Sequence, residues 1–357
     1  MSEQQENSPR AGKPVRVLVV DDSAFARKVV REIFATDHQV EVVGAARDGE
    51  EALEQTAALQ PDLVISDLRM PRMSGVEFVR RQMAVKPLPI LILSSASQDE
   101  VEVVEALNAG AIDVVQKPTA LATDDLKNVR DVLIEKVRGA LSVPVQNLVR
   151  ELTPEASGLA VAPTWRAQKA DIVVIGISTG GPQALRRMLP LFPADFPVPI
   201  AIVLHMPIGY TALYAEKLNE ICALTVKEAA DGDGLRPGLV LIAAAGRHLV
   251  FRRTAADEVV AQTTVQPLDK IHRPSADVLF RSAAETFGER VLAVVMTGMG
   301  EDGKEGCAWV KAKGGQVIAE AEKSCVIYGM PRSVVEAGLS DAVVPLDDMA
   351  QAITRGV

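Results

Sequence analysis

Residues 172–181 have the sequence Ile172-Val173-Val174-Ile175-Gly176-Ile177-Ser178-Thr179-Gly180-Gly181, in which an apolar run leads into a glycine-rich turn that carries a serine. A short apolar run bounded by glycine is typical of a strand buried inside a parallel sheet. The turn after such a strand lies at the carboxyl edge of the sheet, where an exposed serine can act as a nucleophile. Short glycine-rich turns also bind phosphate groups, so this stretch alone leaves both functions open.

Composition and charge narrow the class of protein. The chain has 357 residues, of which 48% are hydrophobic and 24% charged, as in an ordinary globular protein. This length is enough for about two domains. A net charge of -9 without a concentrated stripe of Lys and Arg argues against binding of nucleic acid or anionic lipid.

Cysteine usage and the first residues bear on where the protein works. The three cysteines lie far apart in the sequence, which predicts neither a disulfide framework nor a zinc cluster and suits a reducing compartment. Residues 1–14 are polar and lack the apolar core of a signal peptide, and no run approaches the length of a membrane span. We therefore expect a cytoplasmic protein with a disordered tail over residues 1–14 and no membrane insertion.

The rhythm of apolar runs predicts two domains of the α/β class, both doubly wound, with three layers and mainly parallel sheets. Residues 15–143 alternate apolar runs with amphipathic stretches, which predicts five strands and five helices. Residues 144–169 lose this rhythm and contain prolines among polar and small residues, as a linker does. Residues 170–357 form the second predicted domain. The expected strands cover residues 15–20, 40–45, 63–66, 90–93, 111–115, 172–175, 200–204, 239–243 and 291–296.

Acidic, basic and hydroxyl side chains follow the strands of the first predicted domain. Because the carboxyl ends of parallel strands share one edge of a sheet, we expect these side chains to converge. Clustered carboxylates repel one another unless a cation lies between them, and their oxygen atoms suit Mg²⁺. A phosphoryl group placed there would also be neutralised by an ammonium and a hydroxyl group. The residues are Asp21, Asp22, Asp67, Ser94 and Lys117.

This set resembles the receiver domain of bacterial two-component response regulators. Asp67, with Leu68-Arg69-Met70-Pro71 and Gly75 after it, matches the phosphorylated aspartate of that family and its proline-containing loop. The resemblance implies a flavodoxin-like fold, phosphorylation of Asp67 with support from Ser94 and Lys117, and Mg²⁺ bound by Asp21, Asp22 and Asp67. Helix capping by the aspartates is the alternative, and it leaves the lysine-proline pair unexplained.

One position departs from the receiver pattern. Val114 stands three residues before Lys117, where receivers usually carry an aromatic switch residue. We therefore expect the phosphorylation signal to pass through Ser94 and the loops around it.

Three strand ends of the second predicted domain supply a serine, a histidine and an aspartate. His205 follows the run at residues 200–204 and can act as general base for Ser178. Asp302 follows the run at residues 291–296 through a glycine-rich turn, which lets it fold back toward His205 and presents the Met299 N–H to an oxyanion. His248 precedes another apolar run, so we expect it at the wrong edge of its strand.

The order serine, histidine, aspartate excludes the standard α/β-hydrolases, in which the acid precedes the histidine. The sequence instead resembles the catalytic domain of the chemotaxis protein-glutamate methylesterase. By this resemblance Ser178, His205 and Asp302 form a catalytic triad, Thr179 supports it and Met299 supplies an oxyanion N–H. The matching segments are residues 176–181, 204–206, 273–277, 296–303 and 329–331.

The resemblance implies a Rossmann-like hydrolase domain controlled by phosphorylation. Such an enzyme demethylates γ-glutamyl methyl esters on chemoreceptors and deamidates selected glutamines, with no cofactor for the esterase step. The implied partners are methylated chemoreceptors and the chemotaxis histidine kinase as phosphodonor, with recruitment to membrane receptor arrays.

Other interpretations stay open at this point. A receiver-controlled transcription factor would need a basic recognition helix after the linker, and a dinucleotide-binding module would need an acidic ribose ligand about 20 residues beyond the glycines. The sequence favours neither. Arg273 and Asp277 either bind substrate or form a buried ion pair that braces a loop.

Overall fold

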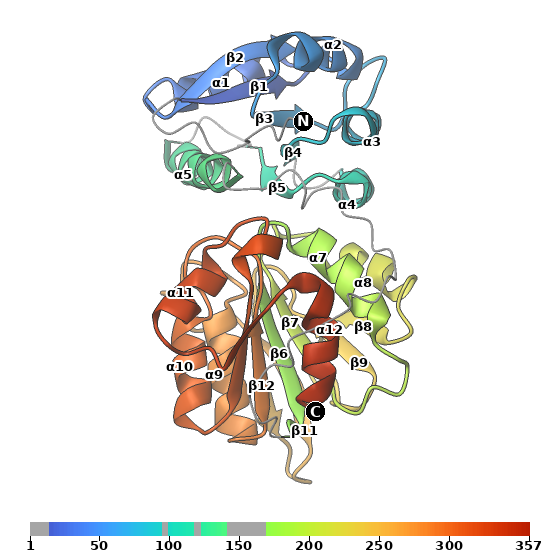
Figure 1. Ribbon diagram of the computed structural model, residues 1–357, viewed down its shortest axis with the longest axis vertical. Helices are drawn as coiled ribbons and strands as arrows, with labels where there is room; N and C mark the ends of the chain where they lie inside the picture. The colour runs from blue at the N-terminus through green and yellow to red at the C-terminus, as the bar shows by residue number, and fades with distance from the viewer. Residues whose placement is uncertain (1–13, 95–98, 118–122, 141–168) are drawn as a thin grey trace, which may run out of the picture.

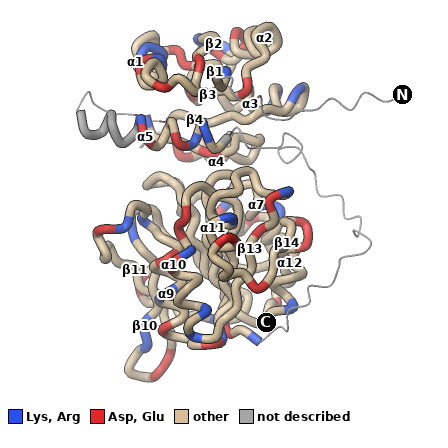
Figure 2. The backbone as a smooth tube through the Cα atoms, turned by 60° about the vertical axis from the view of Figure 1, so that its left-hand side comes forward, with Lys and Arg blue, Asp and Glu red and all other residues tan. Residues whose placement is uncertain are grey.

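The computed structural model describes residues 14–94, 99–117, 123–140 and 169–357. Two parallel sheets, each covered by helices on both faces, lie one above the other in Figure 1. The predicted tail at residues 1–13 and the linker at residues 144–168 lie outside the described residues. Acidic and basic positions are interspersed over both domains (Figure 2). None of the helices in the described ranges has the length and apolar content needed to cross a membrane.

The amino-terminal domain has a five-stranded parallel sheet in the order β2-β1-β3-β4-β5. Strands β1, β3 and β4 are almost entirely buried, because helices cover both of their faces. The five strands and five helices predicted from the sequence are confirmed. The elements are β1 (Val15–Val20), α1 (Ala24–Phe34), β2 (Val40–Ala46), α2 (Gly49–Leu59), β3 (Leu63–Asp67), α3 (Gly75–Val85), β4 (Ile90–Ser94), α4 (Glu100–Ala109), β5 (Asp113–Gln116) and α5 (Thr123–Ala140).

The carboxyl-terminal domain has a seven-stranded parallel sheet in the order β14-β13-β12-β6-β7-β9-β8, and an antiparallel pair of strands, β10 and β11, outside it. Its elements are β6 (Ile172–Ile177), α7 (Gly181–Met188), η1 (Leu189–Leu191), β7 (Ile200–Leu204), α8 (Thr211–Asn219), β8 (Thr225–Glu228), β9 (Leu239–Ile242), β10 (His248–Arg253), β11 (Val259–Thr264), α9 (Ala276–Phe287), β12 (Val291–Val295), α10 (Lys304–Ala312), β13 (Gln316–Glu320), η2 (Glu322–Ser324), α11 (Met330–Glu336), β14 (Ala342–Val344) and α12 (Leu346–Arg355).

Chain order in the second sheet reverses between β6 and β12. From β6 the chain moves to β7 on one side, and it later returns to β12 on the other side of β6. A crevice forms at the carboxyl ends of the strands where a doubly wound sheet changes direction, and ligands bind there. The serine turn follows β6, so the fold places it at this point.

The two domains meet at the carboxyl edge of the second sheet. Helix α4 packs against α7 and α8, and α5 and β5 lie above the same edge in Figure 1. Across the boundary, the Gly180 N–H donates to the Ile112 carbonyl at 3.1 Å and Gln183 Nε2 donates to the Ala111 carbonyl at 2.9 Å. The amino-terminal domain therefore contacts the serine turn directly.

Candidate functional site

Ser178, His205 and Asp302 follow three adjacent strands of the second sheet. Ser178 is the first residue after β6, His205 the first after β7, and Asp302 lies in the turn after β12. The hydrogen bond from Ser178 N–H to the Thr297 carbonyl, 2.9 Å long, ties the serine turn to the end of β12. The strand ends therefore meet as the sequence predicted, and both Ser178 and His205 line one cavity.

Asp302 accepts hydrogen bonds from four groups. Its Oδ2 lies 2.8 Å from His205 Nε2 and accepts the Ala276 N–H at 2.7 Å. Its Oδ1 accepts the Ser275 hydroxyl at 2.7 Å and the Asp277 N–H at 3.1 Å. Burial would raise the pKa of Asp302, but the bonds from His205, Ser275 and Ala276 hold this pKa far below its usual range. The carboxylate sits at the amino end of α9 and is ionised at neutral pH.

The free nitrogen of His205 is available as a proton acceptor. Since Nε2 is bonded to Asp302, the Nδ1 atom remains, and it is buried without a hydrogen-bond partner among the described residues. No hydrogen bond joins His205 to Ser178 in the described part of the chain, although both side chains face the cavity. Apo sites often lack the bond that forms when substrate binds.

Gly298 lets the turn after β12 approach the serine closely. A Cβ atom at Gly298 would lie 2.7 Å from Ser178 Cβ, which no side chain could occupy without displacing the turn. The Thr297 hydroxyl donates to the Thr179 carbonyl at 3.0 Å and holds the two turns together. Met299 lines the cavity beside Ser178, in keeping with the predicted oxyanion position.

His272 is a neighbour of the site for which the sequence indicated no role. Its ring stacks on that of His205, with centroids 4.2 Å apart and an angle of 20° between the planes. Burial and the neighbouring His205 lower the pKa of His272 to about 4, so its ring is neutral at pH 7. Because the His272 ring is neutral, it can stack on His205 without placing a second positive charge beside a protonated His205 ring.

His248 corrects a prediction. It is the first residue of a strand, as the sequence predicted, but that strand, β10, belongs to the antiparallel pair outside the main sheet, so its start does not keep His248 away from Asp302. Its Nδ1 accepts the backbone N–H of Ser275, the residue that precedes α9, at 3.2 Å. The sequence could not reveal this placement, because an antiparallel pair outside the main sheet follows no edge rule.

Asp277 braces the turn that carries Asp302. Its Oδ1 accepts the N–H groups of Gly303 at 2.9 Å and Gly306 at 2.8 Å, and its Oδ2 lies 3.3 Å from Lys270 Nζ. Burial and the nearby Asp302 charge raise the pKa of Asp277. Of the two roles left open by the sequence, loop bracing is the one with contacts, and the cation partner is Lys270.

A cavity of about 310 Å³ contains the site and lies between the domains. Its walls from the second domain carry Ser178, His205 and five residues near them, and its walls from the first come from β5 and α5. The Thr179 hydroxyl donates to Asp113 of β5, and Lys136 of α5 pairs with the same carboxylate at 2.7 Å. A hydrogen bond thus connects the Thr179 side chain to the first domain. The lining residues are Val114, Val115, Gln116, Val132, Glu135, Lys136, Ser178, Thr179, His205, Met206, Pro207, His272 and Met299.

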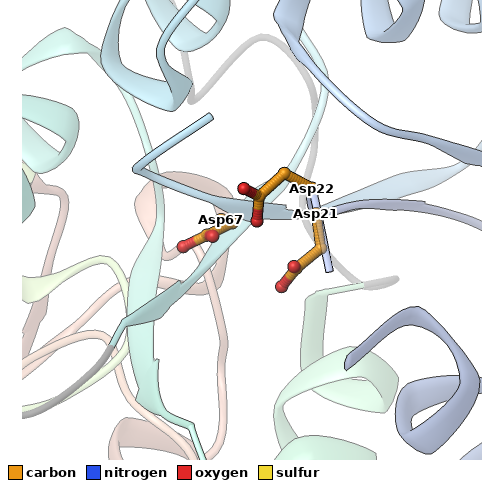
Figure 3. A group of neighbouring side chains, drawn as sticks. All are labelled: Asp21, Asp22 and Asp67. Atoms are coloured by element: carbon orange, nitrogen blue, oxygen red, sulfur yellow. The ribbon is translucent and has the colours of Figure 1, made fainter. Parts of the chain in front are cut away.

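The predicted acidic pocket forms at the carboxyl edge of the first sheet. Ligand oxygen atoms of Asp21, Asp22 and Asp67 all lie within 4.8 Å of one another (Figure 3). Lys117 Nζ lies 2.8 Å from Asp21 and 2.8 Å from Asp67. Burial and the Asp21 charge raise the pKa of Asp67 although Lys117 opposes this, and the two carboxylates raise the pKa of Lys117 against the effect of burial. Three oxygen donors with excess negative charge fit Mg²⁺.

The hydroxyl group of Ser94 makes its hydrogen bonds outside the acidic pocket. Its hydroxyl donates to Asp99 Oδ2 at 2.9 Å and lies 3.0 Å from the hydroxyl of Tyr210, which belongs to the second domain. Ser94 and Tyr210 are both fully buried. Val114, at the position of the usual aromatic switch, is buried and lines the cavity of the other site. No motif in the sequence indicated the contact with Tyr210, which lies 116 residues further along the chain.

Comparison with known families decides the family of the chain. The CheB methylesterase family model matches residues 173–353, and the response regulator receiver domain model matches residues 17–129. The chain belongs to the CheB methylesterase family. Both matches agree with the two resemblances seen in the sequence.

Relatives of this family resemble the chain over nearly its whole length. It is 47% identical over 345 residues to protein-glutamate methylesterase/protein-glutamine glutaminase 5 of Myxococcus xanthus, covering 96% of this chain and 98% of that protein. A protein-glutamate methylesterase/protein-glutamine glutaminase of Halalkalibacterium halodurans is 43% identical, with coverage of 96% and 98%. The crystal structure of the Thermotoga maritima CheB methylesterase catalytic domain matches with a TM-score of 0.51 and 42% identity, covering 53% of this chain and all of that one. The predicted fold class is thereby confirmed.

Proposed function

We propose that this protein is a phosphorylation-activated serine hydrolase that demethylates γ-glutamyl methyl esters on chemoreceptors and deamidates selected glutamines. Family membership and relatives named protein-glutamate methylesterase/protein-glutamine glutaminase support the activity. The observation that carries the chemistry is the bond of 2.8 Å between His205 and Asp302 beside the turn of Ser178. In this proposal residues 15–143 are the receiver, 144–169 the linker and 170–357 the catalytic domain.

The proposed reaction uses the three side chains in sequence. Ser178 Oγ attacks the ester carbonyl and gives its proton to His205 Nδ1, while Asp302 stabilises the imidazolium through Nε2. The Met299 N–H stabilises the oxyanion. Collapse expels methanol, which takes the proton from His205, or ammonia when the substrate is a glutamine. Water then cleaves the acyl-enzyme with His205 as base, which releases glutamate and restores Ser178.

In the first domain, the proposed phosphorylation site is Asp67. Asp21, Asp22 and Asp67 would hold Mg²⁺, which supplies charge neutralisation for the incoming phosphoryl group. Lys117, already 2.8 Å from Asp67, would contact a phosphoryl oxygen. The proposed donor is the chemotaxis histidine kinase, and the proposed location is the cytoplasm, at membrane receptor arrays.

Control of the esterase would act through the boundary between the domains. Walls from β5 and α5 restrict the cavity that contains Ser178, so a receptor segment needs the domains to separate before it can reach the serine. The Ser94 hydroxyl has one proton, which it gives to Asp99. Ser94 therefore accepts from Tyr210. A phosphoryl group on Asp67 that draws the Ser94 hydroxyl toward the acidic pocket would move its oxygen away from Tyr210, weaken this buried contact and shift the population toward an open arrangement.

Methanol release from methylated receptor tests both domains together. We expect slow release from the protein alone and faster release after addition of a small-molecule phosphodonor with Mg²⁺. Ser178→Ala should remain folded and lose turnover by about 10⁶-fold, because the nucleophile is absent. Asp67→Asn should keep the slow rate and lose only the acceleration. Turnover by Ser178→Ala at the wild-type rate would refute the assignment of the nucleophile.

A further inference from the structure

His248 is a buried histidine that is not among the residues lining the cavity of Ser178 and His205. Its side chain is fully buried, and both ring nitrogens have partners. Nδ1 accepts the Ser275 N–H at 3.2 Å, and Nε2 lies 3.2 Å from the Pro267 carbonyl oxygen. A nitrogen that accepts an N–H carries no proton, and a nitrogen that faces a carbonyl oxygen must carry one. These two contacts define a single neutral tautomer with the proton on Nε2.

The surroundings of His248 favour this neutral form. Burial lowers the pKa of His248, and the positive charges of Arg273 and Lys270 act in the same direction. The Pro267 carbonyl and the Asp302 carboxylate oppose them and do not reverse the shift. The ring therefore stays neutral at the pH where a serine hydrolase works, and its acceptor nitrogen remains available to Ser275.

Ser275 links His248 to the triad. It directly precedes α9, and its hydroxyl donates to Asp302 Oδ1 at 2.7 Å. The next two backbone N–H groups, those of Ala276 and Asp277, donate to the same carboxylate at 2.7 Å and 3.1 Å. A shift of the Ser275 backbone would move three of the four groups that hold Asp302.

We propose that His248 is a positioning residue for the esterase reaction: by anchoring the Ser275 backbone it fixes the donors that hold Asp302, and through Asp302 the orientation of His205. This inference rests on the proposed function. Among the described residues, the ring nitrogens of His248 contact only backbone groups, those of Ser275 and Pro267. Its effect is geometric, and a displacement of about 1 Å at a catalytic group lowers a rate by up to about 10²-fold.

Two substitutions of similar size separate the two contacts of the ring. In His248→Asn the amide oxygen can take the place of Nδ1 and accept the Ser275 N–H, while the contact with Pro267 is lost. In His248→Gln the longer amide can reach the Pro267 carbonyl, and no acceptor remains for Ser275. We expect kcat to fall by about 10- to 100-fold in His248→Gln and by less than about 5-fold in His248→Asn, with KM unchanged in both.

The experiment measures methanol release from methylated receptor by the full-length proteins, with active serine counted by a fluorophosphonate probe and Tm recorded. Exposed His38→Gln is the matched control and should behave as wild type. The acidic limb of the kcat profile should move to lower pH in His248→Gln, since a displaced Asp302 stabilises the imidazolium less. A purely structural role would lower the active fraction and Tm without moving this limb.

The outcomes separate the inference from the proposed function. Equal losses in the two variants, a greater loss in His248→Asn, or an unmoved pH limb would overturn the positioning role. No methanol release by wild-type protein that reacts fully with the probe would overturn the proposed substrate. In that case the same kcat and pH measurements on a small carboxylic methyl ester decide the role of His248, since the triad geometry does not depend on the receptor.

Discussion

Asp67 and Asp302 are both carboxylates with little exposure at the carboxyl edge of a parallel sheet, and their environments move their pKa values in opposite directions. Asp302 receives four hydrogen bonds, three of them from the amino end of α9, and these outweigh its burial. Asp67 has one lysine, shared with Asp21, and the second carboxylate adds repulsion. One residue type thus serves two purposes according to the donors around it.

The difference separates a complete site from one that needs further ligands. The donors of Asp302 come from the folded chain, so its charge is stabilised before any substrate binds. The acidic pocket holds more negative charge than Lys117 neutralises, so the proposed phosphorylation requires a cation to bind there first. The folded second domain already stabilises the charge of its carboxylate, whereas the acidic pocket of the first domain depends on the ligands that bind to it.

Among the substitutions that test this comparison, Asp302→Asn has the largest expected effect. An amide at this position can donate to His205 Nε2 and so select the wrong tautomer, which should lower kcat for methanol release by about 10⁴-fold. Phosphorylation of Asp67 by a small-molecule phosphodonor should proceed as in wild type and serves as the control for folding. A loss of less than 10-fold, by an order-of-magnitude criterion, would mean that the carboxylate does not orient His205.

Asp67→Asn tests the other half of the comparison. Because the folded-state pKa of Asp67 is raised, its ionised form costs stability above that pKa, and the cost disappears below the unfolded value of about 4. The variant should therefore have a higher Tm than wild type at pH 7 without Mg²⁺ and an equal Tm near pH 3. Mg²⁺ at about ten times its Kd should stabilise wild type by about 1.4 kcal/mol and the variant by much less.

Exposed Asp131→Asn is the matched control for Asp67→Asn. It removes one negative charge from the same domain outside the acidic pocket, so it should keep the response to Mg²⁺. Thermal unfolding with and without Mg²⁺ makes the measurement. An undiminished response in Asp67→Asn would place the cation elsewhere.

Tyr210→Phe should produce the smallest effect, because it removes one hydroxyl from the contact between the two sites. A hydrogen bond contributes about 0.5–1.5 kcal/mol, so the basal rate of methanol release should rise by roughly 2- to 12-fold. The fully phosphorylated rate should not change. Tyr214→Phe is the control, since the Tyr214 hydroxyl donates to the Pro182 carbonyl inside the second domain. A basal rate that rises equally in both variants would indicate general loosening instead of a contact between domains.

The strands of the first sheet and four central strands of the second were predicted within two residues, and both edge strands of the second sheet were missed. The strand predicted at residues 172–175 is β6, which ends two residues later, and the strand predicted at residues 200–204 is β7 with the same bounds. Both predictions succeeded because continuous apolar sequence indicates a central parallel strand. β5 begins at Asp113 instead of residue 111, because Ala111 N–H still bonds to Ala106 at the end of α4. β8, β11, β13 and β14 were not predicted, since most are short, mixed in polarity or at an edge, and β10 was expected only as the apolar run that follows His248.

Candidate residues were found wherever the edge rule applies. Ser178, His205 and Asp302 each follow a strand of one parallel sheet, so their convergence could be predicted from order alone. His248 and His272 approach the same site from the antiparallel pair and from a loop, for which no such rule exists. Tyr210 meets Ser94 across two domains, and neither sequence segment encodes the packing of the other.

The sequence by itself determined the two α/β domains, the acidic pocket and the order of the three residues proposed as a triad, because strand periodicity and strand ends are local properties. Only the tertiary structure decided which groups hold Asp302, which nitrogen of His205 is left for the serine, and that the receiver borders the catalytic cavity. Those features depend on side chains that are distant in the sequence, and their positions follow from packing.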